Sequence, residues 1–275
     1  MLSARFGELD EAPLLRSPIV SVVWQLRFED HPVLTSPETV LRFHELLGGQ
    51  AQFLLAPLPR VQLSVQPITP TSENAPKPQV GASGGGWRLA SVDGSWSISI
   101  EPVSLAVETT RYGTWQDFLP RLQQVLDALQ KVGAPVIETR LGLRYINVLT
   151  GSAMGKPPIA SPNELSGLIA PWLLGPLQDP DLQNAVQASQ GRAVLAIDQA
   201  NVILNYGVIT TEARELGYAV DIDAYREGGR AFRIEGIAPG TAALHTAALG
   251  LFQASFTRET MQAMRSSGTS AKDLS

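Results

Sequence analysis

The chain lacks cysteine and has few histidines, few aromatic residues and no long apolar run. Its 275 residues include no cysteine, three histidines and 7% aromatic residues. Without cysteine there is no disulfide, no thiol nucleophile and no thiolate metal site. No apolar run reaches the roughly 20 residues that a membrane helix needs, and the first residues contain no apolar stretch typical of a signal peptide. We therefore expect a cytoplasmic protein without membrane association.

The composition is typical of a folded chain. Hydrophobic residues make up 44% and charged residues 17%, and the formal net charge is −5. That hydrophobic fraction is too high, and the net charge too small, for a disordered protein. The length allows one large domain or two ordinary ones. An acidic balance argues against a general nucleic-acid binder, because phosphate contacts require an excess of lysine and arginine.

An eleven-residue segment occurs twice. Residues 18–28 read PIVSVVWQLRF and residues 135–145 read PVIETRLGLRY, so the second segment begins 117 residues after the first. Both start with proline and two β-branched residues, and both end in leucine, arginine and an aromatic residue. The apolar residues of the first segment alternate with others, which is typical of a half-buried strand. The repeat therefore predicts equivalent strands at the start of two similar halves.

The same order of elements follows each repeated segment. A Ser-Pro pair begins a helix in each half, at Ser36 and Ser161, because serine caps the first turn and proline has no amide proton to satisfy there. Short strands and a long amphipathic helix follow in both halves. The expected helices are 37–47, 115–132, 162–174 and 241–264, and the expected further strands are 60–66, 87–92, 96–101, 103–111, 182–190, 192–198, 202–210 and 218–225.

This order predicts an α+β fold built from a duplicated β-α-β4-α unit. We expect one curved antiparallel sheet with pseudo-two-fold symmetry and helices on one face, an arrangement that resembles the repeat of the TATA-binding-protein-like fold. The first unit spans 1–134 and the second 135–266. Residues 67–86 are rich in proline, glycine and serine and predict a flexible loop, and 267–275 predict a disordered tail.

Three segments resemble a bacterial protein family of about this length. SPIVSVVWQLRF, RLGLRYINVL and LHTAALGLFQASFT are similar to the family's PPIVEAxxEIRF, its LGLRYIN and a final helix with His, Phe and Thr. The chain departs from this pattern at Ser17 and Ser21, where the family usually has proline and often glutamate. The family is scattered across unrelated species and has no assigned biochemical activity. The resemblance implies mobile accessory genes, such as those of defence islands or toxin–antitoxin loci.

The three histidines offer little for metal binding. His31 precedes a proline in a loop, His44 lies on a short helix, and no second histidine stands at metal-ligand spacing. His245 lies on the last helix beside Leu244, so we expect it at the edge of the core, with general acid–base catalysis as the alternative. No G-x-x-x-x-G-K-[ST] phosphate loop occurs. We expect no metal and no cofactor.

Charged residues gather on the predicted face of the sheet opposite the helices. With Val20, Trp24 and Phe28 toward the helices, alternation along the strand places Arg27 on the open face. The equivalent strand of the second half and the last strands of both halves add further charges, with Arg144 near the pseudo-two-fold axis. The candidate binding residues of this face are Arg27, Glu108, Glu138, Arg140, Arg144, Asp221 and Asp223.

Three interpretations of this face stay open. Its arginines and carboxylates could neutralise each other, bind a protein partner, or hold a small anionic ligand or nucleotide through paired arginines. Duplex nucleic acid is not expected, because the carboxylates would repel phosphates.

Our leading hypothesis is a non-enzymatic cytoplasmic binding protein that recognises a protein partner, as an antitoxin or as an accessory or sensor component of a defence system. The alternatives are a module for a small anion or nucleotide, and a hydrolase that uses His245 with Asp221 or Asp223. A homodimer is a further alternative, because the edge strands of an open sheet need to be covered.

Overall fold

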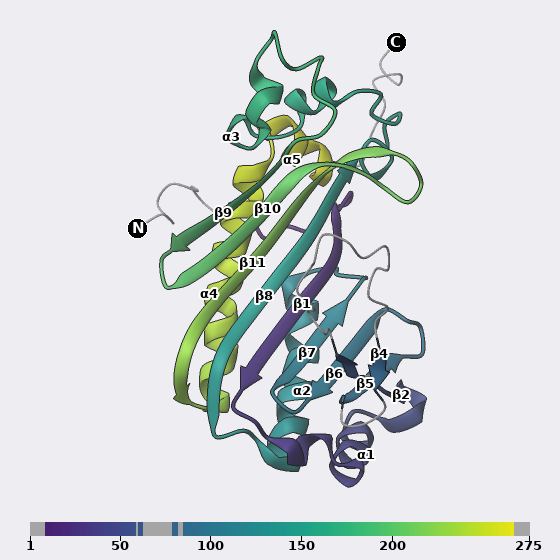
Figure 1. The fold of residues 1–275 in the computed structure, drawn as a ribbon, viewed down its shortest axis with the longest axis vertical. Helices are drawn as coiled ribbons and strands as arrows, with labels where there is room; N and C mark the ends of the chain where they lie inside the picture. The colour runs from purple at the N-terminus through teal and green to yellow at the C-terminus, as the bar shows by residue number, and fades with distance from the viewer. Residues whose placement is uncertain (1–8, 59, 63–78, 82–84, 267–275) are drawn as a thin grey trace, which may run out of the picture.

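A nine-stranded antiparallel sheet forms the centre of the molecule. The computed structural model describes residues 9–58, 60–62, 79–81 and 85–266, which form an α+β fold. The strand order across the sheet is β2-β5-β6-β7-β1-β8-β11-β10-β9 (Figure 1). The strands are β1 (Ile19–Phe28), β2 (Phe53–Pro57), β5 (Trp87–Ser91), β6 (Trp96–Glu101), β7 (Ser104–Thr109), β8 (Ile137–Thr150), β9 (Gln190–Ile197), β10 (Ala200–Thr210) and β11 (Leu216–Ala231). A separate small sheet pairs β3 (Arg60–Gln62) with β4 (Gln79–Gly81).

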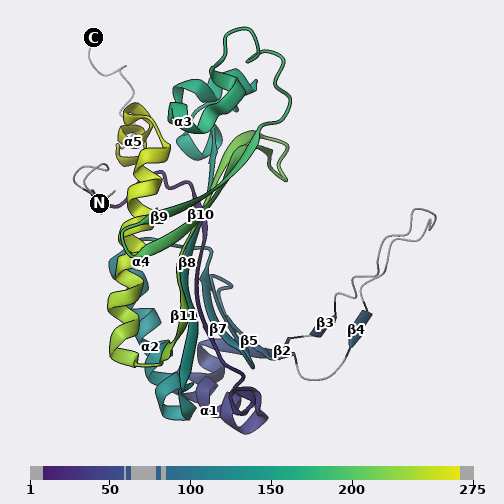
Figure 2. The same ribbon diagram turned by 60° about the vertical axis from the view of Figure 1, so that its left-hand side comes forward.

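The two long helices pack on one face of this sheet. The α-helices of the described residues are α1 (Pro37–Leu46), α2 (Trp115–Gly133), α3 (Pro171–Leu174), α4 (Ile234–Ser255) and α5 (Arg258–Arg265). Short 3-10 helices span Pro32–Thr35, Gly49–Ala51, Ser152–Met154, Pro162–Gly167 and Gly175–Gln178. Figure 2 shows α2 and α4 on the same side of the strands, while no described helix covers the other side of β1, β8 and β11. We call that uncovered side the open face.

Local sequence explains why α2 forms and where it packs. The Thr114 side chain accepts a hydrogen bond from the backbone N–H of Asp117 and so caps the first turn. Apolar residues at helical spacing then form one buried stripe, which comprises Phe118, Leu122, Val125, Leu126 and Leu129. The predicted helix over 115–132 is thereby confirmed.

Trp24 of β1 joins the sheet to α4. Its side chain is fully buried, and its indole N–H donates a 3.0 Å hydrogen bond to the Thr241 hydroxyl of α4. Thr241 in turn donates to the Ile237 carbonyl one helical turn earlier. This bond fixes α4 over the middle of the sheet.

We expect Trp24→Phe to lower the free energy of unfolding by roughly 2 kcal/mol. The change removes the indole hydrogen bond and leaves a small cavity, while the aromatic contact persists. Urea unfolding at neutral pH measures the effect, with Trp172→Phe as a matched control. Trp172 is 49% exposed and donates an exposed hydrogen bond to the Ala254 carbonyl, so its change should lower the stability by less than about 1 kcal/mol. Equal effects of the two changes would contradict the proposed joint.

The two repeated segments pair with each other at the centre of the sheet. In the register of β1 with β8, Gln25 stands opposite Gly142, which occupies the equivalent position in the second segment. On the outer side of β1 come β7, β6 and β5, and on the outer side of β8 come β11, β10 and β9. The first half continues with β2, for which the second half has no counterpart among the described residues.

Two elements predicted for the second half are wrong. The expected helix over 162–174 is a 3-10 helix at Pro162–Gly167 followed by the single turn of α3, because Pro171 holds the preceding Ala170 in an extended conformation. The expected strand over 182–190 consists of turns, and β9 begins only at Gln190. The second half therefore has three strands after its first connection, where four were expected.

Other boundaries also differ from the prediction. The expected helix over 241–264 is longer at its start and interrupted at its end, because Phe256 is extended and Thr257 caps α5 by accepting from the Thr260 N–H. Strand β2 was not predicted. Of the expected strand 60–66, β3 covers the beginning and 63–66 lie outside the described residues. The predicted loop 67–86 contains β4, its residues 67–78 and 82–84 lie outside the described residues, and so does the tail 267–275.

Candidate functional site

Two arginine–aspartate ion pairs lie on the open face. Arg140 and Arg144 of β8 alternate with buried leucines that face the helices, so both arginines point to the open face. The Nη2 atom of Arg140 lies 2.8 Å from both carboxylate oxygens of Asp223. Arg144 binds Asp221 through two parallel bonds, Nε–Oδ1 at 2.6 Å and Nη2–Oδ2 at 2.7 Å. Such charge-assisted contacts hold both side chains in defined positions.

The surroundings of these pairs fix them further. Gly142 leaves room for Arg140, because a Cβ atom there would lie 2.3 Å from the guanidinium Nη1. The Arg140 guanidinium also lies 4.7 Å from the ring centre of Tyr225. Asn205 donates a 3.1 Å hydrogen bond to Asp221. The hydrogen bonds that Arg144 donates to Asp221 raise the pKa of Arg144 above its ordinary value.

Arg27 and Glu108 also lie at the open face but in different environments. Arg27 is exposed and donates a 2.9 Å hydrogen bond to Gln25, and it pairs with no carboxylate among the described residues. Glu108 accepts a 3.0 Å hydrogen bond from the Ser21 hydroxyl. The predicted anion site requires Arg27 and Arg144 to be free. Arg144 is bound to Asp221, so the structure does not contain that site.

The prediction that Glu138 belongs to the open face is wrong. The register of β8 with β1 steps from Arg140 opposite Arg27 to Glu138 opposite Phe28, so that Thr139 is bulged out of the ladder. Glu138 therefore turns to the helix side, where it is 2% exposed. The pairing of β1 with β8 has another shift, between Ile19 and Ser21. Because of it Val20 is 44% exposed, so the prediction that Val20 packs against the helices is also wrong.

Two arginines of β11 surround the buried Glu138. Arg226 donates to it through Nε at 3.0 Å and through Nη2 at 3.2 Å, and the Nε atom of Arg230 lies 3.6 Å away. Gly240 of α4 makes room for Arg226, because a Cβ atom there would lie 2.3 Å from its Nη1. The cluster is a structural ion pair under α4.

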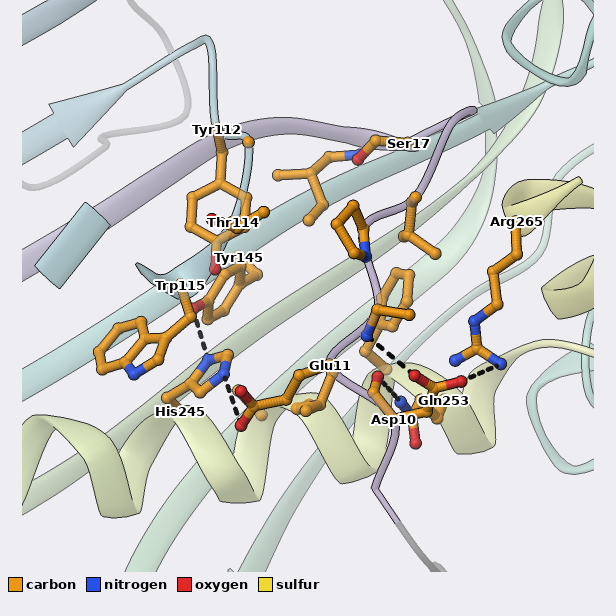
Figure 3. A pocket seen from close by; sticks show the side chains of 18 of the residues that line it. Asp10, Glu11, Ser17, Tyr112, Thr114, Trp115, Tyr145, His245, Gln253 and Arg265 are labelled. Carbon is orange, nitrogen blue, oxygen red and sulfur yellow. Dashed lines mark hydrogen bonds and ion pairs between the residues drawn. The ribbon is translucent and has the colours of Figure 1, made fainter. Parts of the chain in front are cut away.

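A cavity of about 70 Å³ lies on the helix side of the sheet, next to His245. Figure 3 shows the N-terminal segment with Asp10 and Glu11 running past His245 of α4 and Arg265 of α5. Tyr145 of β8 also lines the cavity. The rest of the wall is mostly apolar and includes Ala12, Pro13, Leu14, Ile19, Trp115, Ala248, Leu249, Phe252 and Met261.

His245 is buried and held in a fixed orientation. Its ring stacks on Trp115 with centroids 4.3 Å apart and an angle of 4° between the planes. Its Nδ1 atom lies 2.8 Å from the Tyr145 hydroxyl. Burial lowers the pKa of His245 from 6.5 to about 4, so the ring is neutral at pH 7. Burial also raises the pKa of Tyr145 well above its ordinary value, so that hydroxyl keeps its proton.

No family model and no curated protein matches this chain. The resemblance to the bacterial family therefore stays a prediction. Within the described ranges no helix is long and apolar enough to cross a membrane, and no three histidine, aspartate or glutamate side chains are grouped as metal ligands.

The structure does not bring His245 together with Asp221 or Asp223, as the hydrolase alternative requires. His245 projects from α4 on the helix side, whereas both aspartates lie on the open face and are bound to arginines. The sheet separates the two groups. The one carboxylate of the described residues within ion-pair range of His245 is that of Glu11, whose Oε1 lies 3.9 Å from Nε2, beyond hydrogen-bond distance.

Sequence reasoning missed most of the cavity. It singled out His245 but not Glu11, Trp115, Tyr145 or Arg265, which come from four different parts of the chain. Tyr145 ends the second repeated segment and Trp115 begins α2, so both had a visible local role as core residues. No local pattern places the N-terminal segment against α4.

Proposed function

We propose that the protein is a non-enzymatic binding protein that recognises a protein partner through its open face. The observation that carries the proposal is the overall neutrality of an uncovered surface whose central arginines, Arg140 and Arg144, are already paired with carboxylates. Its cross-strand rows hold five arginines and five carboxylates, namely Arg27, Arg88, Arg140, Arg144, Arg192, Glu101, Glu108, Asp221, Asp223 and Glu227. Such a surface does not attract the phosphates of duplex nucleic acid or a free anion.

Apolar side chains flank the ion pairs. One row of cross-strand partners runs from Val23 through Arg144, Asp223 and Ile203 to Val194, and Val194 is 64% exposed. Arginines held by carboxylates beside aliphatic and tyrosine side chains are typical of the anchors of protein interfaces.

The neighbouring edge of the sheet supports the same kind of partner. Strand β9 has no further strand beside it among the described residues, and Arg192 is its one charged residue. Exposed edges are usually protected by several charges or by proline. A partner can therefore contact the open face near Val194 and pair with the free backbone of β9.

A photo-crosslinking amino acid in place of Val194 tests the proposal in cells of the native host. We expect it to capture one protein reproducibly, and Arg144→Glu to abolish the capture, because that change sets two carboxylates against each other on a face that was neutral. The matched control is the same crosslinker in place of Leu41, which is 52% exposed on α1 away from this face. Circular dichroism verifies that the variants are folded.

Two results would overturn the proposal. Identical captured species at both positions would show that the open face has no specific partner. Capture of a second copy of this chain alone would assign the face to a homodimer.

We infer further that the chain is a duplicated unit related to the TATA-binding-protein-like arrangement, with halves 1–134 and 135–266. The pairing of Gln25 with Gly142, its equivalent in the repeat, supports this inference, as does the matching strand order outward from β1 and β8. The family resemblance suggests a cytoplasmic setting and a partner from a defence or toxin–antitoxin system.

A further inference from the structure

Two buried nitrogen atoms at the His245 cavity have no hydrogen-bond partner among the described residues. They are Nε2 of His245 and Nε of Arg265, and both residues line the cavity. The side chain of His245 is 8% exposed, so water does not compensate its ring nitrogen from outside. A buried polar group without a partner destabilises a fold. The cavity therefore offers hydrogen bonds that the described part of the chain does not use.

We propose that this cavity binds a small uncharged carbonyl compound, whose oxygen accepts a hydrogen bond from Nε2 of His245. The inference is independent of the proposed partner surface, which lies on the other side of the sheet. Three features of the cavity select this ligand: the hydrogen-bond donor Nε2–H, the small cavity volume and the apolar wall.

The donor role of Nε2 follows from its neighbours. The neutral ring carries one proton, and Nδ1 faces the Tyr145 hydroxyl, which is also hydrogen-bonded to Tyr112. When Tyr112 donates to Tyr145, the Tyr145 hydroxyl donates to Nδ1 and the ring proton lies on Nε2. The Glu11 carboxylate, 3.9 Å from Nε2, favours the form in which Nε2 carries the proton. The cavity thus presents an N–H group at one side, and Figure 3 shows Arg265 on the other side of it.

The volume and wall of the cavity set the size and polarity of the ligand. One water needs about 10–15 Å³ on this measure, so 70 Å³ admits roughly five non-hydrogen atoms. The surrounding Ala248, Leu249 and Phe252 side chains favour an apolar body that carries a single polar end.

The charges at the cavity disfavour ionic ligands. Asp10 and Glu11 contribute two carboxylates, and Arg265 contributes one positive charge, which is already bound to Asp10 at 2.8 Å. The remaining negative charge repels an anion. A cation has no lone pair for Nε2–H. An amide, ester or ketone carries no charge and has a carbonyl lone pair for Nε2–H, so it meets both conditions.

Three probes of similar shape and different charge test the proposal, namely propionamide, propionate and propylamine. Because the chain has three histidines, ¹⁵N-histidine labelling resolves the His245 ring from the other two by NMR. At pH 7 we expect propionamide to shift the Nε2 signal of His245 saturably, with a dissociation constant of roughly 1–10 mM for so small a ligand. We expect propionate and propylamine to bind at least tenfold more weakly.

Variants on one helix provide the control. Ala248→Leu fills the cavity and should weaken propionamide binding at least tenfold, whereas Ala243→Leu, on the exposed side of α4, should leave it unchanged. If Ala248→Leu does not fold, His245→Phe keeps the stacked ring and removes the donor, and saturation-transfer NMR on the ligand gives the readout. The proposal fails if propionamide produces no saturable shift, if the charged probes bind equally well, or if filling the cavity has no effect.

Discussion

Replacing Glu138 by glutamine is expected to lower the free energy of unfolding by about 3 kcal/mol. The carboxylate is 3% exposed and accepts two hydrogen bonds from Arg226, which is itself only 20% exposed. Glutamine removes the negative charge and leaves the Arg226 guanidinium under α4 without compensation. Breaking a buried ion pair in this way typically costs 3–5 kcal/mol. Urea unfolding at pH 7 measures the loss.

The matched control for this change is Glu108→Gln. Glu108 carries the same charge on the same sheet, but it is partly exposed and holds one hydrogen bond from Ser21. Its loss should cost less than about 1 kcal/mol. A cost below 1 kcal/mol for Glu138→Gln as well would contradict the assignment of Glu138 to a buried structural pair.

A double variant distinguishes the contribution of the Glu138–Arg226 ion pair from that of the volume its side chains fill. Replacing both Glu138 and Arg226 by methionine removes the two buried charges together, and we expect it to recover most of the stability that the single change loses. An apolar pair of similar volume is often as stable as the ion pair it replaces. Arg230 is 47% exposed and can turn to solvent.

Glu138 also shows where sequence reasoning reaches its limit. Strict alternation places it on the open face with Arg140 and Arg144, and alternation is correct for those two. One bulged residue, Thr139, reverses the direction of Glu138. A bulge depends on how neighbouring strands meet, so the pattern within one strand does not reveal it.

Other parts of the fold were visible in the sequence for identifiable reasons. The repeated segments predicted β1 and β8, and the stripe of Phe118 and its neighbours predicted α2, because both patterns extend over ten or more residues. The failures fall in short elements such as 162–174. That prediction depends on the Ser-Pro start signal at Ser161 alone, and it does not take into account that Pro171 interrupts the helix.

The candidate site was less predictable than the fold. Arg144 binds Asp221 and Arg140 binds Asp223, and these bonds join strands that are distant in the sequence. The sequence could therefore predict only which residues of each strand lie on the open face. The His245 cavity depends on Glu11, which lies more than 200 residues earlier in the chain. Contacts of that range leave no local periodicity.

Lowering the pH from 6.5 to 4 is expected to destabilise the protein by roughly 3 kcal/mol through His245 alone. The pKa of this ring is about 4 in the folded state, against 6.5 for an unperturbed histidine, and each unit corresponds to about 1.4 kcal/mol. Between these two values the unfolded chain binds a proton that the folded chain does not. Stability therefore falls as the pH falls through this window, and the contribution is constant above it.

Comparison with His245→Gln isolates the contribution of this residue. The variant retains the carboxylates and the two other histidines, so their titration appears equally in both proteins and cancels in the difference. Urea unfolding at several pH values from 4 to 8 should give parallel curves for the two proteins above pH 7. Below pH 6.5 the unvaried protein should lose stability more steeply, by a difference that grows to roughly 3 kcal/mol near pH 4.

The same comparison also tests whether the His245 ring is shielded from water in the folded protein. Stacking on Trp115 and the bond to Tyr145 leave the His245 ring little room to meet water, and burial is the cause of the lowered pKa. If the two curves stay parallel down to pH 4, the ring titrates as it does in water. His245 would then be solvated in the folded state, and its Nε2–H would have water as a partner. A steeper fall confirms a neutral, desolvated ring, which is the state that can donate a hydrogen bond into the cavity without carrying charge.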